Sequence, residues 1–154
     1  MKLAEALILR ADCQKRFEQL KARIVRNVKV QEGDAAAENP HDLIAESERV
    51  AYELADLVSR INRTNSTTAY RDGKTISDAL AERDVLALRR GLYSDLALAA
   101  SVTQDRFTRT EVKYVSIINV SEAQKQADAL AKVYREMDAR IQELNWQTEL
   151  VGAQ

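Results

Sequence analysis

The chain has 154 residues, of which 45% are hydrophobic and 31% are charged, a composition that is typical of one globular domain with a buried core. Its 23 basic and 24 acidic side chains leave a net charge of −1, which argues against a general attraction for nucleic acid or for an anionic membrane. The presence of only four Gly and one Pro excludes collagen-like and low-complexity segments, argues against a turn-rich β-sandwich, and favours a few long helices.

The first predicted helix covers about residues 2–27. Its apolar side chains recur every three or four residues, as in a heptad seam, and Arg10 is the one polar intrusion. The seam consists of Leu3, Ala6, Arg10, Cys13, Phe17, Leu20 and Ile24. Cys13 is the only Cys, so an intrachain disulfide is excluded, and its place in the seam predicts a small core residue rather than a nucleophile.

The start of this helix also indicates where in the cell the protein is expected. The apolar run contains Glu5 and is not followed by a small-residue cleavage site, so we interpret it as helix rather than as a signal peptide. No stretch of the chain approaches the roughly 18 uncharged apolar residues of a membrane span. We therefore expect a cytoplasmic protein.

The second predicted helix begins after an extended stretch at residues 28–31 and a loop at 32–38. Asn39 is expected to cap it, with Pro40 in the first helical position, where its missing N–H costs nothing. The helix runs to about residue 65. Its seam consists of Leu43, Ser47, Val50, Leu54, Leu57, Ile61 and Thr64.

The third predicted helix follows a turn marked by Asp72 and Gly73. Thr75 is a suitable N-cap, with Asp78 three residues on, and the helix continues to about residue 102. Gly91 lies in its middle, where it costs roughly 1 kcal/mol relative to Ala, and one hypothesis is that it marks a close helix crossing. An apolar stripe consists of Val85, Leu88, Leu92, Leu96 and Ala99.

Residues 111–119 differ from the rest because they combine β-formers such as Tyr114, Val115 and Ile117 with no helical period. They predict a strand, which could pair with residues 28–31 within one chain or between chains. Ser121 and Gln124 then form the pattern of a capping box that starts the last helix, which ends near residue 150.

These elements predict an all-α fold in which residues 1–154 form a single helical domain. Because two of the connections between the four helices are short, neighbouring helices should run antiparallel, as in an up-down-up-down bundle. The alternative is a longer, partly open array of helical hairpins that completes its core only in an oligomer.

One end of such a bundle would gather polar side chains that could bind a small anion. Arginine presents planar donors to carboxylate or phosphate, and a helix N-terminus adds backbone N–H groups. The candidate ligand-binding residues are Arg60, Asn62, Arg63, Asn65, Arg83, Asp84 and Trp146. The interpretation that we favour is that these residues cap helices and pair with each other, and that Trp146 packs on the end of the core.

Catalytic patterns are missing. His41 is the only His, so with one Cys a zinc site of the Cys/His type cannot form within one chain, and the Glu-x-x-His pairs of a di-iron bundle are absent. There is no nucleophile elbow and no Gly-rich phosphate loop. We therefore predict no catalytic residues, no cofactor and no metal, although chemistry based only on carboxylates stays open.

Several segments together resemble the septicolysin-like family of uncharacterised bacterial proteins. The most specific are Ile61-Asn62-Arg63-Thr64-Asn65 and Asn145-Trp146-Gln147-Thr148-Glu149-Leu150. The resemblance implies a compact helical protein with no established activity or catalytic residues, and the family label implies a haemolysin-type toxin. For a toxin the sequence offers neither a membrane-length apolar segment nor a strongly basic amphipathic helix.

The leading prediction is thus a non-catalytic, self-associating helical protein that acts as a binding or structural module. The alternative is a small-ligand site or an enzyme for an anionic compound, using Arg60, Arg63 and Arg83. A weaker alternative is a membrane-lytic protein. The expected partner is a second copy of the chain, with a small anionic ligand in the alternative, and neither nucleic acid nor membrane is expected.

Overall fold

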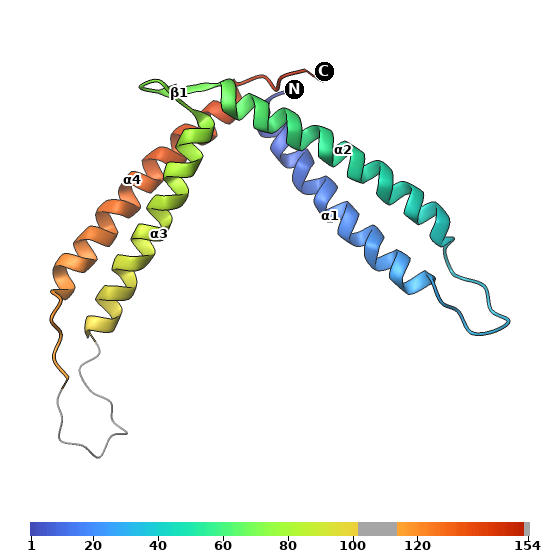
Figure 1. The fold of residues 1–154 in the computed structure, drawn as a ribbon, viewed down its shortest axis with the longest axis horizontal. Coiled ribbons are helices and arrows are strands. Elements are labelled where there is room, and N and C mark those ends of the chain that lie inside the picture. The colour runs from blue at the N-terminus through green and yellow to red at the C-terminus, as the bar shows by residue number, and fades with distance from the viewer. Residues whose placement is uncertain (102–113, 153–154) are drawn as a thin grey trace, which may run out of the picture. The chain divides into compact units, whose positions relative to one another are not determined.

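A computed structural model of the chain describes residues 1–101 and 114–152. It confirms the all-α class, because four long helices hold most of these residues and the strands are very short. The elements are α1 (Leu3–Asn27), α2 (Pro40–Thr67), β1 (Ala69–Arg71), β2 (Lys74–Thr75), α3 (Ile76–Ser101) and α4 (Val120–Gln147). Figure 1 shows α1 beside α2 and α3 beside α4, so the helices form two antiparallel hairpins.

The chain divides into two compact units, one made of Met1–Ala69 with Leu144–Gln154 and the other of Tyr70–Glu143. Each is described here by itself. The interpretation of residues 1–154 as a single domain stays a prediction.

In the first unit, α1 and α2 pack along the two seams that the sequence predicts. Cys13 and Leu20 of α1 and Val50, Leu57 and Ile61 of α2 are buried in this contact. Ion pairs reinforce the edge of the hairpin, where Arg16 contacts Glu46 at 2.5 Å and Arg23 binds Glu38. Asn39 caps α2 as predicted, because its Oδ1 accepts a hydrogen bond from the His41 N–H at 3.0 Å.

The two ends of the chain pair with each other within this unit. The Leu3 N–H donates to the carbonyl of Thr148 at 2.9 Å, and the Leu150 N–H donates to the carbonyl of Met1 at 2.9 Å. The N-terminal amino group and the Lys2 side chain also contact the carboxylate of Glu149. These contacts therefore close the hairpin of α1 and α2 at the end away from its loop.

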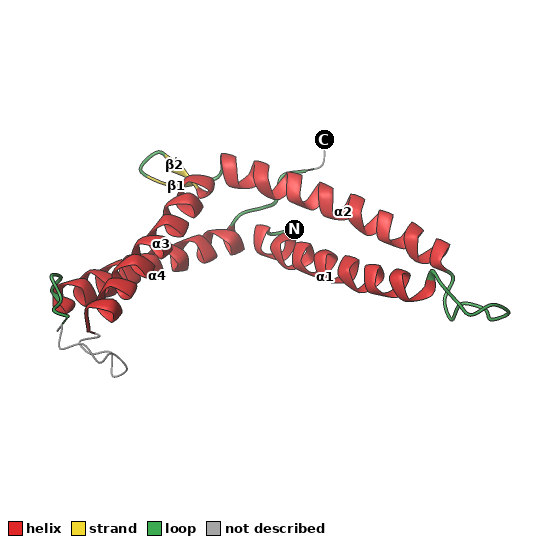
Figure 2. Ribbon diagram, turned by 60° about the horizontal axis from the view of Figure 1, so that its bottom comes forward, coloured by secondary structure: helices red, strands yellow, loops and turns green. Residues whose placement is uncertain are grey.

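The second unit begins with a β-hairpin that the sequence indicates only as a turn (Figure 2). Asp72 and Gly73 both have positive φ, 51° and 75°, which suits a two-residue hairpin turn. The hairpin leads directly into α3. Thr75 and Asp78 cap this helix as predicted: the Thr75 N–H donates to Asp78 Oδ2 at 2.8 Å and the Asp78 N–H donates to Thr75 Oγ1 at 3.3 Å.

The predicted strand at 111–119 is wrong over 114–119, which form a loop, and 111–113 lie outside the described residues. Two side chains explain the difference. The Ser116 hydroxyl donates to the carbonyl of Ile118 at 2.7 Å and accepts its N–H at 3.1 Å, which bends the chain. Asn119 Oδ1 accepts the Glu122 N–H at 3.1 Å, so α4 begins after Asn119 rather than at the predicted Ser121 cap.

The other half of the predicted ribbon, residues 28–31, also contains no strand. Val28 still has helical backbone angles at the end of α1, and the loop that follows ends in a hydrogen bond from the Glu38 N–H to Asn27 Oδ1 at 3.1 Å. The loop is thus closed on α1 through its own polar contacts.

Candidate interaction surface

Four of the predicted site residues lie on the last turns of α2 in the first unit. Arg60 is engaged there, since its Nε donates to the carbonyl of Val151 at 2.9 Å and its Nη1 contacts Asp56 at 3.3 Å. Thr64 accepts the Val151 N–H at 3.1 Å. These two α2 residues hold the C-terminal segment against the helix, which gives Arg60 a structural role.

The neighbouring residues Asn62, Arg63 and Asn65 differ in their surroundings. Asn62 is exposed, whereas Arg63 and Asn65 are half-buried. The Nε atom of Arg63 is buried and has no hydrogen-bond acceptor among the described residues.

The last turn of α4 contributes the remaining predicted residue of this unit. Trp146 is 57% exposed, so its interpretation as a side chain packed on the core is wrong. Its neighbour Asn145 is buried instead, with 5% of its surface exposed. The reason is helical geometry, because Asn145 follows Ile141 by four residues, on the apolar face of α4, and Trp146 lies one position further round.

Arg83 and Asp84 belong to the second unit. The Arg83 guanidinium joins α3 to α4 through a hydrogen bond to Asp138 at 2.8 Å, and it also contacts Asp84 at 3.3 Å. Burial disfavours the charge of Arg83, but the hydrogen bonds to Asp138 and Asp84 outweigh this effect and raise the pKa of the guanidinium. Arg60 and Arg83 thus both have carboxylate partners, and the anion site stays a prediction.

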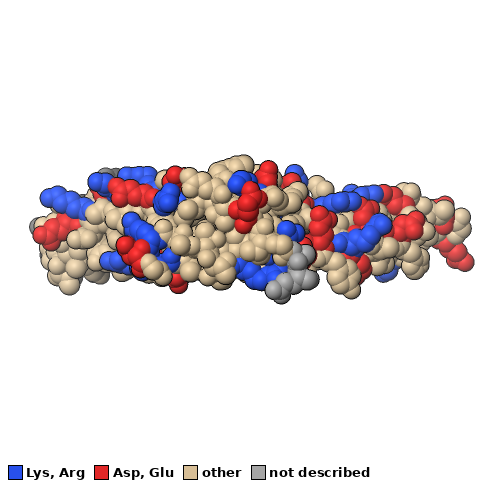
Figure 3. Space-filling view, turned by 90° about the horizontal axis from the view of Figure 1, so that it is seen from above, with Lys and Arg blue, Asp and Glu red and all other residues tan. Residues whose placement is uncertain are grey.

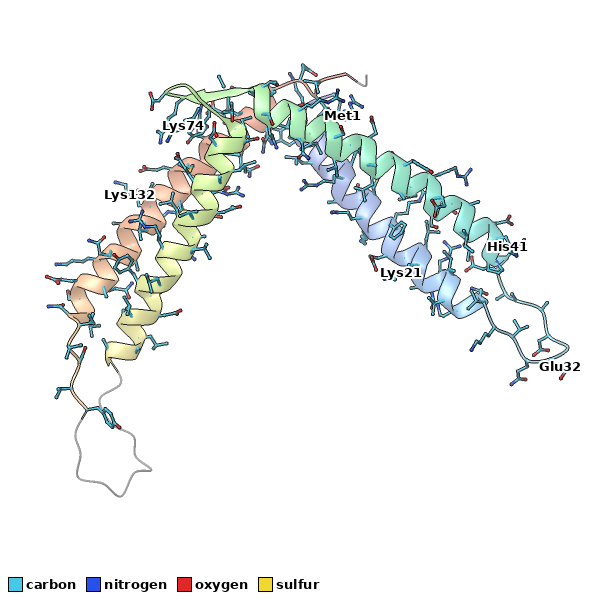
Figure 4. The ribbon with its side chains drawn as sticks, viewed as in Figure 1. Met1, Lys21, Glu32, His41, Lys74 and Lys132 are labelled. Atoms are coloured by element: carbon cyan, nitrogen blue, oxygen red, sulfur yellow. The ribbon has the colours of Figure 1, made fainter. Side chains whose placement is uncertain are left out.

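Two residues with reactive side chains have ordinary structural surroundings. Figure 4 shows His41 at the first turn of α2, and its side chain is exposed. Cys13 is buried in the α1–α2 seam, and burial raises the pKa of its thiol, which lowers its reactivity at neutral pH. Within residues 1–101 and 114–152, no cluster of three or more His, Cys, Asp or Glu side chains could hold a metal ion.

The surface that stands out is the central part of α3. Only three residues of this helix are buried, Ile76, Ala79 and Ala97, and none of these lies between residues 80 and 96. Val85, Leu88 and Leu92 are 52%, 74% and 57% exposed. Much of the apolar stripe that the sequence predicts on this helix is therefore open to solvent.

Helical geometry places this stripe away from the contact with α4. Residues of an α-helix turn by about 100° each, so Val85, Leu88 and Leu92 share one face. Ala79, Arg83 and Ala97 lie on the roughly opposite face, where Arg83 reaches Asp138 of α4. We call the first face, with Ala81 at its start, the α3 stripe; it consists of Ala81, Val85, Leu88 and Leu92.

Charged residues border the α3 stripe. Glu82 and Arg89 lie along one edge, seven residues apart, and Asp84 lies along the other. Glu82 also binds Lys74 of the β-hairpin, whose position Figure 4 shows. An apolar centre between charged edges is the usual pattern of a helix that packs on another helix.

A second exposed apolar stretch precedes α4. Tyr114, Val115 and Ile117 are all exposed. Soluble monomers rarely expose contiguous apolar patches larger than a few hundred Å². Figure 3 shows basic and acidic side chains interspersed over the face in view. On that face no broad area of one sign indicates a nucleic-acid or anionic-membrane surface.

No helix within the described ranges is both long and apolar enough to cross a membrane.

The described residues form two helical hairpins, and their most distinctive feature is an exposed apolar face on α3. Residues 10–150 match a family described as "Family of unknown function (DUF6847)", and the chain belongs to this family. The predicted resemblance to the septicolysin-like family is wrong, since the matching family is a different one. The two most specific motifs on which that resemblance depended lie in the last turns of α2 and at the end of α4.

A solved structure is also similar over nearly the whole chain. It is described as the crystal structure of a functionally unknown conserved protein from Corynebacterium diphtheriae. The two sequences are 50% identical, the match covers 98% of this chain and 99% of that one, and the TM-score is 0.93. No protein of curated function matches the chain. The function of the family is unknown, and neither description names a catalytic or toxin activity.

Proposed function

We propose that this protein is a non-catalytic helical protein that self-associates and acts as a binding or structural module. The observation that carries the proposal is the α3 stripe, where three large apolar side chains are more than half exposed in the middle of a long helix. Such a face is stabilised when a partner removes it from water.

Simple energetics support an association through this face. Burial of apolar surface contributes about 25 cal/mol per Å², and complete burial of a Val or Leu side chain contributes about 1.5–3 kcal/mol. The stripe holds three such side chains per chain, and in a symmetric pair both copies would bury theirs. This gain is large enough to offset part of the entropy that association costs.

The remaining features fit a module without catalysis in the cytoplasm. Cys13 is a free, buried thiol, as is common for proteins that fold in a reducing compartment. Arg60 and Arg83 are engaged in structural contacts, so no specific observation favours the anionic-ligand enzyme as a second function.

Size-exclusion chromatography with light scattering tests the proposal. We expect a mass of at least twice the 17.3 kDa of one chain at micromolar concentration, falling on dilution. A mass of one chain at every concentration up to several hundred micromolar would contradict it.

A further inference from the structure

The spacing of the α3 stripe and the charges beside it indicate which partner covers it. We infer that two copies of the chain associate through α3, with the two helices antiparallel and the contact centred between Val85 and Leu88. This inference rests on the proposed self-association and specifies its surface and orientation.

The first argument is the register of the apolar residues. Ala81, Val85, Leu88 and Leu92 are spaced four, three and four apart, so the set reads the same in both directions. When Val85 of one copy lies opposite Leu88 of a second, Leu88 lies opposite Val85 and Ala81 lies opposite Leu92. The small Ala81 thus meets the large Leu92 at both ends, as interdigitated helix packing requires.

The second argument is the charge along the edge of the stripe. In antiparallel helix pairs the same edge of each helix faces its counterpart. The register that matches Val85 with Leu88 also brings Glu82 of one copy beside Arg89 of the second, and the two-fold symmetry repeats this pair. The edge that carries Glu82 and Arg89 is therefore complementary to itself.

The third argument concerns the opposite edge. There the same register brings Asp84 beside Gly91 of the second copy. Gly91 is half-exposed, and a Cβ added to it would meet no atom within 4 Å, so the packing of the chain itself does not require glycine at this position. Glycine in mid-helix costs about 1 kcal/mol, and room for a second helix is a reason to have it there.

A parallel pair is the competing arrangement. It would bring Arg89 beside Asp84, so it also forms opposite-charge pairs, but it aligns the two helix dipoles in the same direction, which is unfavourable. Either arrangement leaves Asp78 and Asp95 beyond the ends of the stripe, where crossing helices diverge. The dipoles, together with the Asp84–Gly91 match, favour the antiparallel pair.

Charge reversal tests the contact. We expect Glu82→Arg and Arg89→Glu each to weaken self-association roughly tenfold in Kd, because each replaces two attractive pairs with two repulsive ones. An equimolar mixture of the two variants should associate as a heterodimer, since all its pairs are again opposite in charge. Arg135→Glu and Glu136→Arg, which change exposed residues of α4, are the matched controls and should leave Kd unchanged.

Cysteine cross-linking tests the orientation in a Cys13→Ser background whose helix content is first compared with that of the unaltered chain. In the antiparallel pair Ala81 lies near Leu92 of the second copy, whereas like positions are about 16 Å apart along the helix. A mixture of Ala81→Cys and Leu92→Cys chains should form the mixed disulfide, and neither variant alone should form a disulfide-linked dimer. Cross-linking of each variant alone, without the mixed product, would show a parallel pair and overturn the proposed orientation.

Leu88→Asp separates failure of this inference from failure of the proposed function. It should abolish association, because it puts a charge into the centre of the contact, without loss of helix content. A variant that still associates like the unaltered chain would overturn the α3 contact but leave self-association intact. An unaltered chain that is monomeric throughout would overturn both.

Discussion

The two hairpins use similar apolar patterns in different ways. In the first, α2 has six buried residues spread from Leu43 to Thr64, and it packs against α1. In the second, α3 has an apolar stripe of the same spacing, but its buried residues lie only near its ends. The comparison teaches that heptad spacing shows which face of a helix is apolar, whereas the origin of its cover, from the same chain or from another, is not encoded in the spacing.

The largest expected effect is a difference in stability between substitutions of one leucine in each hairpin. Leu20 of α1 is buried and Leu88 of α3 is exposed. Leu20→Ala should lower the free energy of unfolding by about 2–5 kcal/mol, because it leaves a cavity in a packed seam. Leu88→Ala should change it by less than about 1 kcal/mol under conditions where the chain is monomeric.

Urea denaturation followed by circular dichroism at low micromolar concentration measures both changes. Val25→Ala, at another exposed apolar position, is the control for truncation on a helix surface. Equal losses for Leu20→Ala and Leu88→Ala would show that the α3 stripe is covered within the chain.

The next effect compares the start of one helix in each hairpin. Asn39 caps α2 and Thr75 caps α3, each through a side-chain oxygen that accepts a backbone N–H. Asn39→Ala and Thr75→Ala should each cost about 1 kcal/mol. Amide hydrogen exchange resolved by helix should show the loss mainly in α2 for the first variant and mainly in α3 for the second, because the two hairpins belong to different compact units. Loss of protection in both hairpins from either variant would show that they unfold together.

These caps also indicate which features of the fold can be predicted from the sequence. The starts of α2 and α3 could be predicted because Asn39 and Thr75 act on residues two or three positions away. The strand prediction failed at 114–119 for a related reason: the bonds of Ser116 and Asn119 to nearby backbone outweigh the β propensity of the apolar residues between them.

Contacts between residues that are far apart in the sequence could not be predicted in this way. The pairing of Leu3 with Thr148 and the contact of Arg60 with Val151 join residues far apart in the sequence, and no local pattern announces them. The candidate anion site was inferred from an assumed bundle that brings helix ends together. Its arginines lie in two units, and Arg60 and Arg83 have structural partners that spacing alone could not identify.

A smaller effect sharpens the contrast in the second hairpin. Gly91→Ala should stabilise the monomeric chain by up to about 1 kcal/mol, since alanine is the better helix former and the added Cβ meets no neighbouring atom within 4 Å. The same change should weaken self-association if α3 of a second copy approaches this position. Urea denaturation and light scattering on one sample series would show the two effects with opposite sign. A gain in stability with unchanged association would show that Gly91 is not part of the contact between the two copies.

The smallest expected effect concerns acid and the first hairpin. Hydrogen bonds to Arg23 and Arg16 hold the pKa of Glu38 and of Glu46 below the ordinary glutamate value. A carboxylate whose pKa is lower in the folded state contributes stability at pH values above its unfolded pKa, about 4.3, and this contribution is lost as the pH falls towards the folded value. Both pairs are exposed enough for salt to screen them, so the effect should be modest.

Comparison of the unaltered chain with Glu38→Gln at pH 7 and pH 3 measures this contribution. The variant should be less stable than the unaltered chain at pH 7. The difference should shrink at pH 3, where protonation of Glu38 weakens in the unaltered chain the ion pair that the variant already lacks. Glu136→Gln, on α4 at the long edge of the ion-pair range, provides the control, and its difference should be small at both pH values. A Glu38→Gln deficit that does not change with pH would show that the charge of the Glu38 carboxylate does not account for the loss.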